Sequence, residues 1–174
     1  YTYESSYGGL FSNINSDFIS GMFFSSGGFS AKYGNALSGV LDLKTKDEPM
    51  KKIYKIGLSL AATELSLSSP ILDETFGVHI NGRKNFTDPI FWLNGKNSNF
   101  TNEPNSKDFS ANLIYKYSNK GRIKTFISYA DDKQGVLINQ PGYIDEFKGK
   151  SRNYLVNTQF SDILFANLIL KTSI

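Results

Sequence analysis

The sequence GGFSAKYGNALSGVLDLKTK, residues 27–46, combines a glycine-rich turn with an alternating strand. Gly27, Gly28 and Gly34 permit positive φ angles and close backbone approach, as a chain that folds back on itself requires. Residues 40–44 then alternate between the two sides of an extended chain, which is typical of a half-buried strand. The stretch therefore predicts a tight turn that leads into a packed strand, and we expect a β-branched side chain at any of the three glycines to be strained.

The order of residues around this turn resembles the end of the plug domain of TonB-dependent outer-membrane receptors. In that family the plug ends with a hydrophobic strand, a Gly-Gly-Phe-x-Ala-x-Tyr-Gly turn and a Ser-Gly-Val-Leu-Asp-Leu strand that closes in Thr-Lys. The form with Gly-Gly-Phe and Leu-Asp-Leu is most similar to the receptors of Bacteroidetes. The matching residues are Phe23, Phe24, Gly27, Gly28, Phe29, Ala31, Tyr33, Gly34, the run 38–43, Thr45 and Lys46. One position departs, because Ser26 stands where a basic residue commonly precedes the paired glycines.

The composition permits membrane insertion by strands but not by helices. The 174 residues contain no apolar run of about 18 residues, as a membrane helix needs, whereas a membrane strand needs only about 9–11 alternating residues. Aromatic residues make up 14% of the chain, and the absence of Cys excludes disulfides and thiolate metal sites. The net charge of +3, with both signs interspersed, gives no support for nucleic-acid binding.

Seven segments after residue 52 alternate between apolar and polar residues, which predicts an antiparallel meander. They are 54–60, 65–71, 76–80, 109–117, 123–129, 154–160 and 164–170. Together with the resemblance, they predict an all-β fold. We expect the C-terminal part of a plug domain in residues 1–49 and, in residues 50–174, about seven first strands of a transmembrane antiparallel β-barrel. The chain starts YTYESS and stops inside an apolar strand, so we expect a piece of a longer protein.

The connections between these segments alternate in length. The short ones are 72–75, 118–121 and 161–163 and the long ones 84–108 and 131–150, while 61–63 breaks the rule by being short. Outer-membrane barrels have short turns in the periplasm and long loops outside. We therefore expect both long connections to be extracellular loops. Tyr115, Tyr117 and Phe160 lie beside short turns, where an aromatic girdle at the periplasmic interface is expected.

Alternation also assigns the two faces of the strands. If the apolar faces meet lipid, the opposite faces meet the plug and the water of the lumen. The residues expected to face lipid are Leu113, Tyr115, Val156 and Leu168, and those expected to face the lumen are His79, Asn81, Arg83, Asn112 and Asn157. His79 is the single His of the chain, which excludes a multi-histidine metal site here and favours a hydrogen-bonded wall residue.

Four aromatic residues fall in the two connections expected to be extracellular. Phe91, Trp92 and Phe100 lie in the first and Tyr143 in the second. Exposed aromatic side chains on polar loops can contact a ligand or a partner, or they can pack together into a small loop core. The sequence leaves both interpretations open.

The resemblance implies active import across the bacterial outer membrane. The cargo would be a nutrient ligand such as a siderophore, cobalamin, a peptide or a glycan. The partners would be outer-membrane lipid, the TonB complex and, as a candidate, a surface-exposed lipoprotein. No nucleophile with a base, paired catalytic carboxylates or phosphate loop stands out, so we expect neither an enzyme nor a cofactor.

Two other functions remain open from the sequence. The first is a receptor-like barrel that does not transport and serves as an interaction subunit of an outer-membrane assembly. The second is a secreted, glycan-binding β-sandwich, which detergent dependence would distinguish from either barrel. A TonB-binding segment would precede residue 1, so its presence cannot be read from these residues.

Overall fold

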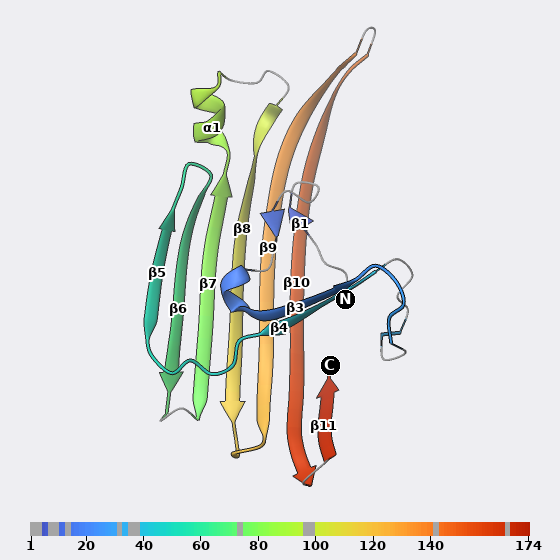
Figure 1. Cartoon of the computed structure of the whole chain (residues 1–174). Coiled ribbons are helices and arrows are strands. Elements are labelled where there is room, and N and C mark those ends of the chain that lie inside the picture. The colour runs from blue at the N-terminus through green and yellow to red at the C-terminus, as the bar shows by residue number, and fades with distance from the viewer. Residues whose placement is uncertain are drawn as a thin grey trace.

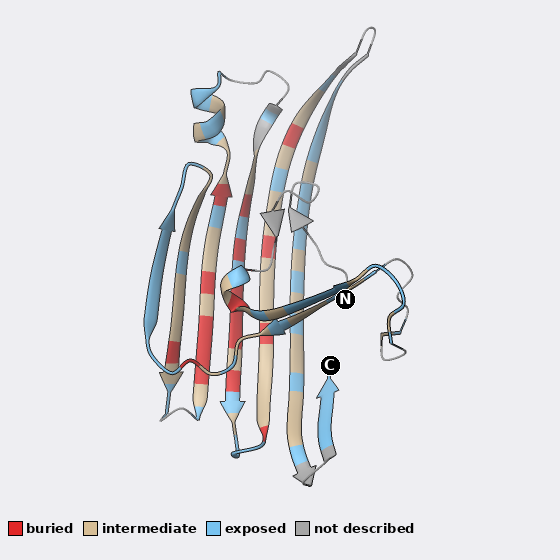
Figure 2. Cartoon of the chain, in the orientation of Figure 1, coloured by how far each residue is buried: buried red, intermediate tan, exposed pale blue. Residues whose placement is uncertain are grey.

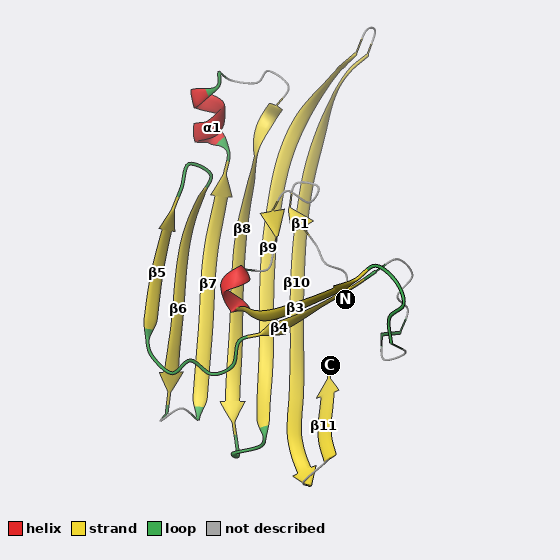
Figure 3. Ribbon diagram, viewed as in Figure 1, coloured by secondary structure: helices red, strands yellow, loops and turns green. Residues whose placement is uncertain are grey.

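The computed structural model describes residues 5–6, 11–12, 15–30, 33–34, 39–72, 75–95, 100–140, 143–165 and 168–174. These residues form antiparallel sheets with very little helix (Figure 3). The all-β class predicted from the alternating segments is therefore confirmed.

Seven strands form one large antiparallel sheet in the order β11-β10-β9-β8-β7-β6-β5, so that each strand pairs with its neighbour in sequence (Figure 1). The strands are β5 (Ile53–Leu58), β6 (Ala62–Ile71), β7 (Phe76–Phe86), β8 (Phe100–Lys116), β9 (Arg122–Gln140), β10 (Tyr143–Phe165) and β11 (Leu168–Ser173). Each corresponds to one of the seven predicted segments. Among the described residues the sheet is open, with β5 and β11 as its edges.

The N-terminal segment adds short elements on one side of this sheet. They are β1 (Ser5–Ser6), β2 (Phe11–Ser12), the 3-10 helix η2 (Ser16–Phe18), β3 (Ile19–Ser25) and β4 (Val40–Thr45). β3 and β4 pair as an antiparallel hairpin that runs steeply across the strands of the large sheet in Figure 1. Helix α1 (Asp88–Leu93) lies between β7 and β8, with Pro89 in its first turn, where a missing N–H costs nothing.

The register shows which of the alternating side chains share a face of the sheet. His79 pairs with Asn112, Asn112 with Phe126, and Phe126 with Asn157, so these four residues share one face of the sheet. Leu113, Tyr115 and Val156 have the opposite parity and share the other face. We call these the inner and the outer face. The side chain of Leu168 lies outside the described residues.

The core lies between the inner face and the N-terminal segment, and buried residues concentrate on β7, β8 and β9 (Figure 2). Phe18, at the end of η2, is 1% exposed, with its ring 6.1 Å from that of His79 and 6.5 Å from that of Phe126. Burying one Phe side chain contributes roughly 1.5–3 kcal/mol. Phe18 therefore anchors the N-terminal segment to the sheet.

The prediction of a long connection at 131–150 is wrong. β9 and β10 pair without interruption from Arg122 and Ser161 to Gln140 and Tyr143, so this region is a long hairpin that projects beyond the rest of the sheet. The turn expected at 161–163 is also displaced, because β10 continues to Phe165. Where a hairpin leaves the sheet and is polar on both faces, its residues no longer alternate between apolar and polar. The alternation therefore did not predict the outer parts of β9 and β10.

The connection predicted at 84–108 is shorter than expected, because β7 runs to Phe86 and β8 starts at Phe100. The first residues of β8 are mostly polar and include Pro104, which cannot donate to the ladder. The pairing of β8 with β9 shifts register between Phe100 and Asn105, around this proline. The polar composition and the proline both explain why the sequence did not predict a strand here.

Candidate functional site: the contact between the N-terminal segment and the inner face

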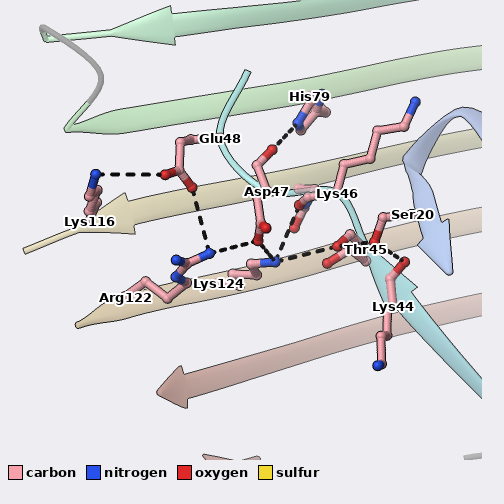
Figure 4. A network of polar contacts seen from close by, with 11 residues as sticks. Ser20, Lys44, Thr45, Lys46, Asp47, Glu48, His79, Lys116, Arg122 and Lys124 are labelled. Carbon is pink, nitrogen blue, oxygen red and sulfur yellow. Dashed lines mark hydrogen bonds and ion pairs between the residues drawn. The ribbon is translucent and has the colours of Figure 1, made fainter. Parts of the chain in front are cut away.

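Residues 45–49, which we call the strap, start at the last residue of β4 and cross the inner face of β7, β8 and β9 (Figure 4). Beyond Thr45 the strap belongs to no strand, so its carbonyl groups need partners outside a β-ladder. The inner face supplies them as side chains. Several hydrogen bonds and ion pairs here join residues distant in sequence, which makes this contact the candidate site.

Three side chains of the inner face donate hydrogen bonds to backbone oxygens of the strap. Asn112 donates from Nδ2 to the carbonyl oxygen of Lys46 at 3.1 Å, and Lys124 donates from Nζ to the same oxygen and to that of Thr45, each at 3.4 Å. His79 Nε2 lies 2.9 Å from the carbonyl oxygen of Asp47. A carbonyl oxygen can only accept, so His79 donates from Nε2 here, and its Nδ1 lies 2.8 Å from Ser68 Oγ.

Charged side chains reinforce the same contact. Asp47 Oδ1 lies 2.8 Å from Arg122 and also contacts Lys124 Nζ, while Glu48 lies 3.9 Å from Arg122 and 4.0 Å from Lys116. Partial burial acts to raise the pKa of Asp47, but the hydrogen bond and charge of Lys124, with those of Arg122, outweigh it. The pKa of Asp47 therefore lies below its usual value. The strap is held as an anion against a basic part of the wall.

Gly77 makes room for the end of the strap. A Cβ atom at Gly77 would lie 2.6 Å from Pro49 Cδ and 3.1 Å from Glu48 Cβ, closer than side chains tolerate. Pro49 is buried. The absence of a side chain at Gly77 is thus what allows the strap to lie directly on β7.

The strap is one anchor between the N-terminal segment and the inner face, and a second anchor precedes β3. Asn15 donates from Nδ2 to Glu64 Oε1 at 2.7 Å, and Asn81 donates to the same oxygen at 2.9 Å. Asp17 pairs with Lys55 at 2.8 Å. The two anchors are joined where the Lys46 amide donates to the carbonyl oxygen of Phe18 at 2.8 Å. The hairpin of β3 and β4 is therefore fixed to the wall at its base.

A cavity of about 350 Å³ lies beside these anchors, between the strap and strands β5, β6 and β7. Its lining includes Asp17, Lys46, Glu48, Met50, Lys55 and His79. Both charge signs and an exposed Met meet there, so the cavity is a gap at the contact rather than a shaped pocket for one chemical class.

A second polar cluster lies farther along the inner face, away from the strap. Arg83 donates from Nε and from a terminal nitrogen to Asp108 Oδ2, both at 3.1 Å. Asn85 donates to the same oxygen at 3.1 Å and to Ser106 Oγ at 2.7 Å. The Asp108 side chain is 4% exposed, so removal of Arg83 would leave a buried charge without its cation.

The turn residues are only partly as predicted. Gly28 has a φ of 66°, but neither Gly27 nor Gly34 has a positive φ, and a Cβ atom at either would meet nothing within 4 Å. The expectation of strain at Gly27 and Gly34 is therefore wrong, because the turn is open rather than confined. Tyr33 holds the turn instead, since its hydroxyl donates to Asp42 Oδ2 at 2.8 Å and its ring stacks on Phe23. Phe29, in the same turn, is half-buried.

The other predicted site residues are distributed over both sides of the molecule. His79, Asn81 and Asn112 lie on the inner face at the two anchors, and Arg83 lies on the same face in the second polar cluster. Asn157 lies farther off and donates to the Ile174 carbonyl oxygen at 3.4 Å. Phe91 and Trp92 lie on α1, where Trp92 is 76% exposed and Phe91 is half-buried. Phe100 and Tyr143 are strand residues, and their side chains lie outside the described residues.

Several residues of this site were not predicted from the sequence, among them Asp47, Gly77, Arg122 and Lys124. Asp47 lies near the end of the first of the two expected parts of the chain, where no pattern marks it as a contact. Gly77 and the two basic residues lie in strands whose alternation was recognised, but nothing in that alternation indicates which polar residue meets the strap.

The outer face has a different organisation, which the register reveals as rows of paired residues. Two rows carry aromatic residues: Leu65, Gly82, Phe109, Tyr129 and Tyr154, and Ile71, Phe76, Tyr115, Ile123 and Phe160. The two rows between them are Leu67, Ile80, Ala111, Ile127 and Val156, and Ser69, Val78, Leu113, Thr125 and Thr158. None of these residues is charged.

Charged residues return immediately outside these four rows. Beyond Phe109, Tyr129 and Tyr154 comes a row of Lys84, Lys107, Asp131 and Arg152. At the other limit, the Tyr117 hydroxyl donates to Asp162 Oδ2 at 2.7 Å. We call the four uncharged rows the apolar band. Several of its large side chains are strongly exposed, including Tyr154 at 73% and Val156 at 62%.

No family model, curated protein or solved structure matches this chain. Among the described residues, no helix combines the length and apolarity needed to cross a membrane. The same residues contain no group of three or more His, Asp or Glu side chains placed to hold a metal ion.

Proposed function

We propose that this chain is part of a TonB-dependent outer-membrane receptor that imports a nutrient ligand, as its resemblance to that family implies. Residues 1–49 would be the end of the plug, and residues 50–174 the first strands of the barrel. The observation that carries the proposal is the apolar band on the outer face, bounded on both sides by aromatic residues and then by charged ones.

The spacing of the charged rows on either side of the band fits a bilayer. From Tyr115 to Phe109 the band itself extends roughly 20 Å along the strand, at about 3.4 Å per residue, which is about 16 Å in height for strands tilted by about 40°. The bounding rows lie roughly 34 Å apart along the strand, which is about 26 Å in height at the same tilt. The lipid-facing band of outer-membrane barrels is about 25 Å tall, with aromatic girdles at both limits.

The inner face supports the second half of the proposal. A barrel that encloses a plug needs a polar inner wall, and here His79, Asn112 and Lys124 bind backbone oxygens of the strap. The strap would keep the last part of the plug attached to the wall. Motion driven by the TonB complex would then have to occur elsewhere in the plug or break these contacts.

Closure of the wall requires more strands than the described chain contains. β5 pairs only with β6, and β11 only with β10, among the described residues. A sheet edge in lipid would leave backbone groups without hydrogen bonds, which costs several kcal/mol for each group. We propose that further strands of the same receptor complete the barrel, which in plugged transporters has 22 strands.

Exposed apolar rows argue against the soluble alternative. A secreted sandwich buries one face of each sheet against another sheet, and here Tyr154, Val156 and Leu65 remain exposed on the outer face. A contiguous apolar surface of this kind indicates contact with a membrane or another protein. The proposal places the protein in the bacterial outer membrane, with lipid as the partner of the band.

The test uses the full-length protein in cells with and without TonB. We expect the protein in the outer-membrane fraction, soluble only in detergent. We further expect that uptake of one labelled nutrient class, from siderophores, cobalamin, peptides and glycans, requires both the receptor and TonB. Outer-membrane assembly without any receptor-dependent uptake would indicate a non-transporting subunit. Recovery as a detergent-free soluble protein would indicate a secreted β-sandwich.

A further inference from the structure

We propose that the outer face carries a binding surface for anionic lipid head groups, formed by Lys84, Lys107, Lys133, Lys148, Lys150 and Arg152. We call these six residues the basic cluster. The inference rests on the proposed membrane placement of the outer face and adds to it which lipids the protein contacts and at which edge of the band.

The register places the basic cluster in successive rows at one edge of the apolar band. Lys84, Lys107 and Arg152 lie in the first row beyond the aromatic residues. Lys133 and Lys150 pair with each other in the next row, and Lys148 pairs with Gly135 in the row after that. Residues two apart on a strand point to the same side, so all six side chains leave the sheet on the outer face.

The charges of the cluster are largely uncompensated. All six side chains are exposed. Arg152 lies 3.8 Å from Asp131 and Lys148 lies 2.9 Å from Glu146, whereas Lys84, Lys107, Lys133 and Lys150 have no ion pair among the described residues. The chain as a whole has 19 Lys and Arg residues and a net charge of +3. Almost a third of its cations therefore gather on one patch of one face.

Among the described residues, the opposite edge of the band has no comparable cluster. Its described outward residues include the Tyr117 and Asp162 pair, and Lys120 lies in the turn beyond it. Basic residues near that edge, such as Arg122 and Lys124, point to the inner face, where they bind Asp47. The outward positive charge is thus confined to the edge that carries α1 and the projecting hairpin (Figure 1).

The position of the cluster favours a lipid over a dissolved anion. Phe109, Tyr129 and Tyr154 form the row directly beneath it, and aromatic side chains of this kind lie at the level of head groups. Lys and Arg at the edge of an apolar band extend their aliphatic stems over apolar surface and place the charge in the polar layer. A flat surface of spread cations fits several phosphates of a head-group layer, whereas a single small anion needs a cradle.

The test measures lipid selectivity of the detergent-purified full-length protein by native mass spectrometry. Phosphatidylglycerol and phosphatidylcholine are titrated separately, and bound lipids are counted. Each basic residue near an anionic surface contributes roughly fivefold to binding. We expect phosphatidylglycerol to bind about tenfold or more tightly than phosphatidylcholine, and the variant Lys84→Gln, Lys107→Gln, Arg152→Gln to lose most of this preference.

The matched control removes three exposed cations outside the cluster, in the variant Lys52→Gln, Lys120→Gln, Lys171→Gln. It should keep the wild-type preference, and Lys107→Arg should keep it as well. Equal loss of preference in the control variant would overturn the inference, because net charge alone would then explain it. Displacement of phosphatidylglycerol by excess inorganic phosphate would also overturn it, since the site would then bind any phosphate.

The outcome is separable from that of the proposed function. A protein that needs detergent and prefers phosphatidylglycerol, yet imports nothing, would leave the lipid surface standing and refute transport. A protein that imports cargo but shows no lipid preference would refute the lipid surface alone. A protein that is soluble without detergent would refute both.

Discussion

The inner and outer faces of the large sheet are built by alternate residues of the same strands, and they differ in what they bind. On the inner face His79, Asn112 and Lys124 each bond to backbone oxygens of one specific segment. On the outer face Tyr154 and Val156 are strongly exposed, and their rows contain no charge. The inner face is therefore specified contact by contact, whereas the outer face is specified by a pattern of polarity.

This difference predicts how each face responds to substitution. A specific contact fails when one atom is misplaced, and nearby positions without contacts are tolerant. A patterned surface tolerates exchanges that keep its polarity and fails when a charge enters it. The following changes compare the two faces at neighbouring positions, beginning with the largest expected effect.

The largest effect should come from a charge in the apolar band. Val156 and Asn157 are consecutive residues of β10 at the same depth, on opposite faces. We expect Val156→Arg to destabilise the receptor in lipid vesicles by about 2–4 kcal/mol, as Arg does near a bilayer midplane. Asn157→Arg should cost less than about 1 kcal/mol, because its face is polar. Equal costs in urea titrations would contradict the assignment of the faces.

A slightly smaller effect should follow from filling the space beneath the strap. Gly77→Ala would place a methyl group against Pro49 and should cost about 1–3 kcal/mol as overpacking. Gly82→Ala on the same strand is the control, since a Cβ atom there meets nothing within 4 Å. Limited proteolysis should cut the strap faster in the first variant. Identical cleavage in both would show that the strap does not rest on Gly77.

Removing one donor from the inner face should have a comparable or smaller effect. Asn112 is fully buried, and Asn112→Leu would leave the Lys46 carbonyl oxygen dependent on Lys124 alone. We expect a loss of roughly 1–3 kcal/mol, the usual penalty for a buried polar group deprived of its partner. The double variant Asn112→Leu, Lys124→Met should cost more than Asn112→Leu alone. If the two substitutions lowered the free energy of unfolding only slightly and additively, water would be replacing the lost donors.

Acid should loosen the strap, with a modest effect. The pKa of Asp47 lies below its usual value of 3.8, so its ion pairs contribute stability above that pH and lose it as pH falls through the lowered pKa. Proteolysis of the strap by an acid-stable protease should therefore accelerate below about pH 4. In Asp47→Asn this acceleration should shrink, because the titrating group is gone. An unchanged profile in the variant would assign the effect to another carboxylate.

The smallest effect on folding should be at Trp92, because its side chain is 76% exposed on α1. Trp92→Ala should change the free energy of unfolding by less than about 0.5 kcal/mol. If Trp92 contacts cargo or a partner, the same variant should weaken that binding by about 1 kcal/mol or more. Unchanged uptake in Trp92→Ala and Phe91→Ala would place recognition outside this helix.

The sequence predicted the seven strands because their centres lie within the apolar band, where alternation is strong. It failed at the ends of β8, β9 and β10, where residues such as those at 131–135 are polar on both faces. The sequence did predict that polar residues such as His79 and Asn81 lie on the inner face. It did not predict which groups they bind, because no sequence pattern marks the backbone oxygens of Lys46 and Asp47 as acceptors.

The turn at 27–34 shows the opposite limit of sequence analysis. Three glycines suggested a strained and confined chain, but only Gly28 has a positive φ, and the surrounding space is open. The residue that organises the turn is Tyr33, through its contacts with Asp42 and Phe23. A glycine permits an unusual backbone without requiring one, so its presence could not decide the geometry.

The most direct test of the two-faced wall is a scan of spin-labelled cysteines along residues 153–158 in lipid vesicles. This chain has no native Cys, so each label in it would be at a known position. We predict alternation: labels at Tyr154, Val156 and Thr158 collide with oxygen dissolved in the bilayer, whereas labels at Asn153, Leu155 and Asn157 are shielded from it. Equal accessibility of both sets to a water-soluble reagent would contradict the account, because neither face would then meet lipid.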